Sequence, residues 1–151
     1  MKERIKVYAY ITRGTELLIF EERGFPEGGF QVPGGTPEPG EGPEIAALRE
    51  AIEETGLEGL QMNRYLGEEL FDVSIYGLNE IHRRKFYHIL YDQDTPMTWT
   101  HIERDPSIIT EKTPDVIVFE FRWWDLNQGK PQLQAGFDAK LDKVIDKIVK
   151  S

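Results

Sequence analysis

Hydrophobic and polar residues alternate near the start of the chain in a pattern that predicts two paired strands. Residues 4–12 alternate and are rich in Ile, Val and Tyr, and residues 16–21 (ELLIFE) form a second apolar run. Arg13-Gly14-Thr15 between them is a turn sequence, so the two runs are expected to form a β-hairpin. Residues 23–29 indicate a loop, and residues 30–32 a short extended piece.

Four further strand patterns follow later in the chain. Residues 60–73 predict a strand interrupted at residues 67–69. Within residues 80–92, apolar or aromatic side chains fall on both faces, which is typical of an interior strand covered on both sides. A short strand is expected at residues 97–101 inside a long irregular segment, and a strong one at residues 115–124 (DVIVFEFRWW).

Two segments have the spacing of amphipathic helices. Gly42-Pro43 indicates the start of the first, because proline suits a first helical turn, and Gly56 indicates its end. Placing residues about 100° apart puts Ile45, Leu48 and Ile52 on one face, which is therefore predicted to be buried. The second helix is predicted at residues 137–149 from an apolar stripe: Phe137, Leu141, Val144, Ile145, Ile148 and Val149.

Together these elements predict an α+β fold, with a mixed β-sheet between helices in an α/β/α sandwich. The length of 151 residues suits one domain, so residues 1–151 are expected to form a single domain.

Composition narrows the classes of function. The chain has no cysteine, which excludes disulfides, thiolate metal sites and cysteine nucleophiles. The net charge of −9 argues against binding to duplex nucleic acid, which requires a basic face. No apolar run is long enough to cross a bilayer, and the start of the chain lacks the layout of a signal peptide. We therefore expect a cytoplasmic protein with no membrane partner; the pattern leaves the oligomeric state open, a homodimer included.

The first predicted helix carries the candidate chemistry. Glu50, Glu53 and Glu54 are spaced i, i+3 and i+4 and so lie close together on its surface. Like charges at these spacings destabilise a helix by about 0.2–0.5 kcal/mol each, and the helix dipole repels anions in the last turn. A cation among them would relieve both effects. Oxygen ligands suit hard ions, so Mg²⁺ is the first candidate, with Mn²⁺ or Ca²⁺ as alternatives.

The segment from Gly35 to Leu57 resembles the Nudix box, G-x5-E-x7-R-E-U-x-E-E-x-G-U, where U is a bulky aliphatic residue. The positions in register are Gly35, Glu41, Arg49, Glu50, Glu53, Glu54, Gly56 and Leu57. Ala51 is the one departure, at a position where the pattern prefers a larger aliphatic residue. The resemblance covers about a sixth of the chain, and it implies the Nudix fold.

The resemblance also implies a reaction and roles for its residues. Nudix enzymes hydrolyse a phosphoanhydride bond in a nucleoside diphosphate linked to another group, using water activated by metal and a glutamate. Glu50 and Glu54 match direct metal ligands, Glu53 a ligand or catalytic residue, and Glu41 a ligand or a contact behind the ligands. Arg49 matches the arginine that orients these glutamates.

Residues outside the box complete the hypothesis. Family members often supply the general base from a later segment, and Glu120, Glu111 and Glu103 are the candidates, with Glu120 preferred because it lies within an apolar strand. Gly34 and Gly35 allow a ligand to approach the backbone closely. Arg23 is a candidate for phosphate contact and Trp99 for stacking on a planar group. Arg83, Arg84 and Lys85 are further candidates for phosphate contact, but a solvated basic turn is the simpler interpretation.

The predicted substrate is a small phosphorylated nucleotide: a nucleoside triphosphate, a dinucleoside polyphosphate or a nucleotide sugar. The proline that marks ADP-ribose enzymes is absent, because Phe71 and Asp72 stand in that region. The alternative function is a Nudix-fold module that binds or senses a nucleotide without cutting it, and a purely structural acidic domain is a third. The complete set of box glutamates favours the enzyme.

Overall fold

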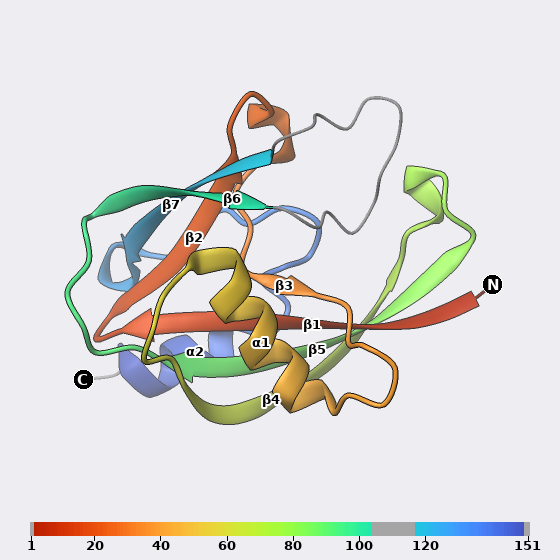
Figure 1. The fold of residues 1–151 in the computed structure, drawn as a ribbon, viewed down its shortest axis with the longest axis horizontal. Helices are drawn as coiled ribbons and strands as arrows, with labels where there is room; N and C mark the ends of the chain where they lie inside the picture. Colours follow the sequence, from red (N-terminus) through yellow and green to blue (C-terminus); the bar gives the residue numbers. More distant parts are fainter. Residues whose placement is uncertain (1, 104–116, 150–151) are drawn as a thin grey trace.

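A computed structural model describes residues 2–103 and 117–149 of the chain. Figure 1 shows a sheet with one helix in front and one behind. The strands are β1 (Lys2–Arg13), β2 (Glu16–Glu22), β3 (Gly34–Gly35), β4 (Gln61–Asp72), β5 (Glu80–Leu90), β6 (Thr98–Glu103) and β7 (Ile117–Asp125). The helices are α1 (Pro43–Thr55) and α2 (Leu141–Ile148).

The strands form one mixed sheet in the order β4-β5-β1-β2-β7-β6, with β3 paired to β1. β1 and β5 run parallel, and the other pairs are antiparallel. The predicted hairpin of β1 and β2, the interior position of β5 and the short strand at β6 are all confirmed.

Alternate residues of the strands build a separate core on each face of the sheet. Ala9 and Ile11 of β1 belong to the cluster beneath α1, together with Phe121 of β7. Tyr10, between them in sequence, belongs to the cluster that packs on α2. This alternation follows from the period of two in a strand, and it confirms the α+β sandwich predicted from the sequence.

Two predicted elements, β4 and α2, differ from the structure in more than a shift of one or two residues at their ends. β4 is continuous where an interruption was expected, and shifts of register between Met62 and Arg64 and between Tyr65 and Gly67 absorb the irregular sequence. α2 begins at Leu141, four residues later than predicted. Phe137 nevertheless packs in the same core, and its carbonyl oxygen accepts a hydrogen bond of 2.5 Å from the hydroxyl of Tyr10.

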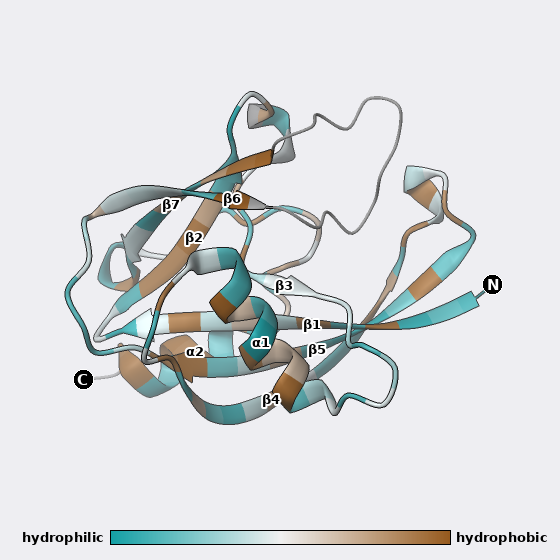
Figure 2. Cartoon of the chain, in the orientation of Figure 1, coloured by the Kyte–Doolittle hydropathy of each residue, from teal (hydrophilic) through white to brown (hydrophobic). Residues whose placement is uncertain are grey.

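Of the three residues predicted to form the buried face of α1, only Leu48 packs against the core, and the prediction was wrong for Ile45 and Ile52. Ile45 and Ile52 are 66% and 44% exposed, and the hydropathy colouring of α1 shows apolar residues on its outer side (Figure 2). The residues that face the sheet are small or functional: Ala46, Ala47, Ala51, Glu54 and Thr55. Alanines let the helix axis approach the sheet closely, and Glu50 and Glu54 must point inward to reach β3. Ala51, the departure from the box, is one of these contacts.

β1 and β2 pair only next to their turn, at Thr12–Leu17 and Arg13–Glu16. Nearer the start of β1, Val7 and Tyr8 pair instead with Gly35 and Gly34 of β3. The two halves of the sheet therefore separate where β3 enters, and β3 carries the glycine loop to the middle of the sheet, beside α1.

Within residues 2–103 and 117–149, no helix is both long and apolar enough to span a membrane.

Candidate active site

Arg49 of α1 gathers three carboxylates around its guanidinium. Its Nε and Nη2 donate to the two carboxylate oxygens of Glu41 at 2.8 and 2.9 Å. Its Nη1 donates to Glu50 at 3.0 Å and to Glu53 at 3.2 Å. Bidentate pairing of this kind fixes both partners in orientation. The structure thus brings together the residues that the box places in register.

This arrangement changes the electrostatic argument made from the sequence. Hydrogen bonds from Arg49 and from the backbone of Glu38 lower the pKa of Glu41 to about 2, so this carboxylate is ionised at neutral pH. The same contacts raise the pKa of Arg49. Part of the repulsion expected among the glutamates is therefore already offset by the arginine, before any metal binds.

The glycine loop lies directly against two of the glutamates. The backbone N–H of Gly34 donates to Oε1 of Glu54 at 3.1 Å, and Glu54 is only 6% exposed. A Cβ atom added to Gly35 would lie 2.3 Å from the carboxylate carbon of Glu50. Glycine is therefore required at position 35 for this carboxylate to keep its place. Arg49 also donates to the carbonyl oxygen of Thr36 at 3.3 Å, which ties the loop to the helix.

The donors at this site are carboxylate oxygens, which fit a hard divalent cation. Within the described part of the chain, no group of three His, Cys, Asp or Glu side chains is arranged closely enough to enclose an ion. Glu53, whose side chain is 58% exposed, is held by Arg49 and can turn toward solvent. The residues present therefore fit a site of few protein ligands, in which the substrate phosphates supply the others, as is usual for Mg²⁺.

Two side chains of β6 hold the C-terminal end of α1. His101 donates from Nε2 to the carbonyl oxygen of Glu53 at 2.8 Å, and Trp99 donates from Nε1 to that of Thr55 at 3.2 Å. The last carbonyls of a helix have no partner within it, so such donors satisfy them. This contact could not be predicted from the sequence, because it depends on how β6 lies against α1.

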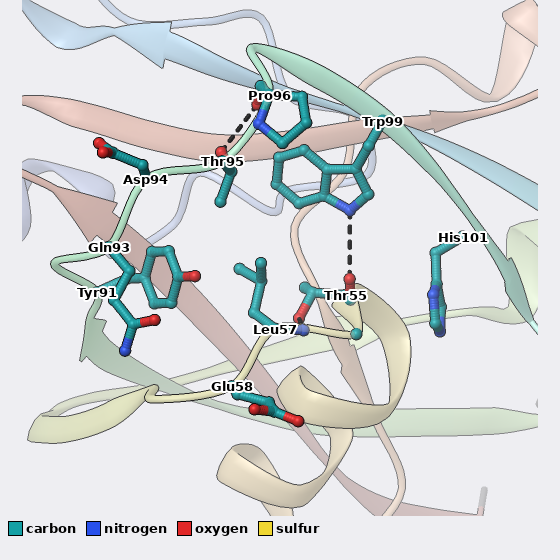
Figure 3. A pocket seen from close by; sticks show the side chains of 11 residues that line it. Thr55, Leu57, Glu58, Tyr91, Gln93, Asp94, Thr95, Pro96, Trp99 and His101 are labelled. Atoms are coloured by element: carbon teal, nitrogen blue, oxygen red, sulfur yellow. Dashed lines mark hydrogen bonds between the residues drawn. The ribbon is translucent and has the colours of Figure 1, made fainter.

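Trp99 is thus placed as a packing residue at the end of the helix. Its indole stacks on the ring of Phe121, with the two ring centres 5.3 Å apart. The indole also borders an open cavity of about 480 Å³. Figure 3 shows the ring above Thr55 and Leu57 at the edge of this cavity. Stacking of Trp99 on a substrate, which the sequence predicted, stays a prediction.

Arg23 and Glu120, predicted separately, form an ion pair of 2.7 Å. Phe119 and Phe121, on either side of Glu120, contact the core cluster beneath α1, so Glu120 points away from that cluster. Among the residues that the structure describes, no hydrogen bond or ion pair joins Glu120 to the glutamates of α1. Glu111 lies outside the described residues, as does the side chain of Glu103.

The comparisons with known proteins agree with this geometry. The sequence profile of the NUDIX domain matches residues 2–147. The fold is similar to UDP-X diphosphatase, at 15% identity and a TM-score of 0.62, over 97% of this chain and 63% of that one. It is similar to the MutT NUDIX hydrolase from Burkholderia pseudomallei, at 21% identity and a TM-score of 0.59, over 95% and 99% of the two chains. It is also similar to the MutT protein from Methanosarcina mazei Go1, at 19% identity and a TM-score of 0.62, over 99% and 97%.

The chain spans less than two thirds of UDP-X diphosphatase and nearly all of the two MutT proteins. A search of curated proteins finds no match.

Proposed function

Because the chain belongs to the Nudix hydrolase family, we propose that it hydrolyses a phosphoanhydride bond in a nucleoside diphosphate linked to another group, with Mg²⁺ as the preferred cofactor. The observation that supports this most is the grouping of Glu41, Glu50 and Glu53 around Arg49, beside the glycine loop. The same proposal takes residues 1–151 as one domain, and a nucleoside triphosphate, dinucleoside polyphosphate or nucleotide sugar as substrate. Cytoplasmic location stays a prediction.

The bound cation would be held by Glu50 and Glu54, with Glu53 and Glu41 contributing directly or through water, and would neutralise charge on the phosphates. The residues of the chain supply the rest. Arg49 orients Glu41, Glu50 and Glu53 through its ion pairs, and its hydrogen bonds help to keep Glu41 ionised. Because Gly34 and Gly35 lack side chains, the Tyr8 ring and the Glu50 carboxylate pack directly on this loop, which holds Glu50 beside the place proposed for the diphosphate.

A carboxylate must also accept the proton of the attacking water. Glu53 is the most exposed glutamate in the Arg49 group and is free of the tight contacts that hold Glu41. Glu120 is the candidate outside the helix, and Arg23 pairs with it. Comparing the pH profiles of Glu53→Gln and Glu120→Gln would identify the base, because only its loss removes the acidic limb of the kcat profile.

The first test is release of phosphate or pyrophosphate from a panel of nucleotides with Mg²⁺ or Mn²⁺. For the substrate that is cut, Glu54→Gln should lower kcat by about two orders of magnitude or more, since it removes a charged group from the metal site. Glutamine keeps the oxygen that accepts from Gly34, so the circular dichroism spectrum should not change.

Glu44→Gln is the matched control, because it removes an exposed carboxylate from the same helix. Equal kcat values for Glu54→Gln and Glu44→Gln would reject the proposed chemistry. A panel with no turnover but with nucleotide binding would favour the non-catalytic binding module instead.

A further inference from the structure

Two basic side chains lie opposite each other on the α2 side of the sheet. The parallel register of β1 and β5 pairs Lys6 with Arg84. Lys6 is half-buried, and Arg84 is only 4% exposed. Like charges opposite each other on neighbouring strands repel, and burying a charge is costly unless it is paired. This pair is therefore unfavourable without an anion nearby.

The described residues do not supply that anion. Neither Lys6 nor Arg84 forms an ion pair with any carboxylate in residues 2–103 and 117–149. The ammonium of Lys6 donates to the hydroxyl of Thr36 at 2.6 Å, and Nη1 of Arg84 donates to the carbonyl oxygen of Ala135. The Nε of Arg84 is buried, and no described residue accepts a hydrogen bond from it.

The acids that act on Lys6 are already engaged. Glu80 binds Arg4 at 2.7 Å and His82 at 3.1 Å, and Glu50 belongs to the group around Arg49. Burial and the charge of Arg4 lower the pKa of Lys6 in spite of these two acids. Burial likewise lowers the pKa of Arg84. Excess positive charge thus gathers here in a chain whose net charge is −9.

Aromatic rings fix the guanidinium of Arg84 in place. Its central carbon lies 3.8 Å from the ring centre of Phe71, 4.7 Å from that of Phe137 and 5.3 Å from that of Tyr8. Such stacking orients the planar group without neutralising its charge. The guanidinium of Arg84 is therefore fixed in an orientation in which it could bind an anion, unlike that of a mobile surface arginine.

Arg84 differs in this from its neighbours in sequence. Arg83 pairs with Glu3 and Glu68, and Lys85 also pairs with Glu68. Those two match the solvated basic turn expected from the sequence. Because residues alternate along β5, Arg84 alone of the three points to the α2 side.

Thr36 connects this pair to the candidate active site. Its hydroxyl accepts from Lys6, and its carbonyl oxygen accepts from Arg49. The two glycines before it face opposite ways: a Cβ on Gly35 would meet Glu50, and one on Gly34 would meet Tyr8. The loop thus has the Glu50 carboxylate on one side and, on the other, the Tyr8 ring that packs on Arg84.

We propose that Lys6 and Arg84 form an anion-binding site that receives a phosphate or carboxylate group of the substrate, on the other side of the glycine loop from the glutamates. The identity of the ligand as a substrate group rests on the proposed function, whereas the binding of an anion does not. The substrate would then carry an acidic group in addition to the phosphates at the metal site.

Binding can be measured without turnover. In EDTA, which removes divalent ions, pyrophosphate should raise the melting temperature of the native protein relative to sodium chloride of equal ionic strength. Lys6→Gln should weaken the apparent affinity for pyrophosphate by about tenfold, the loss expected for one charged hydrogen bond. Lys147→Gln, which removes an exposed lysine from α2, should leave the affinity unchanged.

A second measurement does not depend on the stability of a variant. The side-chain Nε–H resonance of Arg84 in the native protein, assigned by its absence in Arg84→Lys, should shift on addition of pyrophosphate in EDTA. No shift, or equal pyrophosphate affinity in Lys6→Gln and Lys147→Gln, would overturn the site.

Kinetics then separates the two sources of the anion. If it is part of the substrate, Lys6→Gln should raise KM for substrates with an extra acidic group while kcat changes less than about twofold. If the site takes a separate anion, KM for those substrates stays constant while pyrophosphate binding is still lost. If the protein cuts no nucleotide but still binds pyrophosphate through Lys6, the proposed function is contradicted, whereas the anion-binding site is supported.

Discussion

At the scale of single residues, Gly35 shows how a backbone position can be functional without carrying a side chain. A methyl group at this position would lie 2.3 Å from the carboxylate carbon of Glu50. The carboxylate of Glu50 lies at the end of a flexible side chain, so it can move aside at little cost in stability. Its displacement removes a candidate ligand from the site.

We therefore predict that Gly35→Ala lowers kcat/KM by about tenfold to a hundredfold, while the free energy of unfolding falls by less than about 1 kcal/mol. Urea denaturation and initial rates at several Mg²⁺ concentrations measure the two effects. Gly42→Ala, where the added atom meets nothing within 4 Å, is the control. Parallel losses of activity and stability would show that Gly35 matters only for folding.

His88 is a buried residue whose titration should affect folding. It is 1% exposed, and hydrogen bonds of 2.7 and 3.0 Å join its ring to Thr12 and Asn63. Burial, followed by the charge of Arg64, lowers the pKa of His88 from 6.5 to about 4. Between these values the unfolded chain binds a proton that the folded chain does not, so stability falls as the pH falls.

We predict that the free energy of unfolding drops by about 2 kcal/mol between pH 7 and pH 5 because of this residue. Urea melts across that range measure it. His88→Gln lowers stability at every pH, but its free energy of unfolding should change much less between pH 7 and pH 5. An unchanged slope in the variant would assign the acid sensitivity to other groups.

The residues of the site were predictable to different degrees. The box placed Glu41, Arg49 and Glu50 in register, and the structure joins them. The pairing of Lys6 with Arg84 could not be predicted from the sequence. The two residues are 78 positions apart, and their pairing depends on the register of two parallel strands.

At the scale of elements, α1 shows a limit of hydrophobic periodicity. The pattern located the helix and both of its ends, but it assigned the buried face to Ile45 and Ile52. Packing requires a different face: the alanines allow close contact with the sheet, and Glu50 and Glu54 must lie against β3. The spacing of apolar residues reflects neither requirement. The buried face of a helix that carries a polar site therefore cannot be predicted from that spacing alone.

The contact between β6 and the end of α1 gives a prediction at this scale. His101→Ala removes the donor to the carbonyl of Glu53, so the last helical turn, which carries Glu53 and Glu54, should become less ordered. We expect kcat to fall about threefold to tenfold and stability to fall by about 1 kcal/mol. His101→Gln can still donate and should recover most of kcat, whereas equal activity of both variants with the native protein would contradict this role.

At the scale of the whole molecule, excess acid and a divalent cation are linked. The chain carries a net charge of −9, and part of this charge lies in the glutamates of the site. An ion that binds only the folded state stabilises it by mass action. We predict that millimolar Mg²⁺ raises the melting temperature more than sodium chloride of equal ionic strength does.

The matched variants make this effect specific. Glu50→Gln should lose most of the stabilisation by Mg²⁺, and Glu44→Gln should keep it. If all three proteins respond equally, the ion acts by general screening and the metal site is refuted. Differential scanning fluorimetry with and without EDTA is sufficient for the comparison.

The separation of β1 from β2 has a consequence for related chains. Residues 23–33 leave the end of β2, pair back with it at Phe20–Gln31 and deliver Gly34 and Gly35 alongside β1. An insertion or deletion between Glu22 and Phe30 would shift Gly34 and Gly35 relative to the glutamates of α1, while β1 keeps its register with β5. In related chains the length of this one connection can therefore change the surroundings of the candidate site, while the helix that carries the glutamates is left untouched.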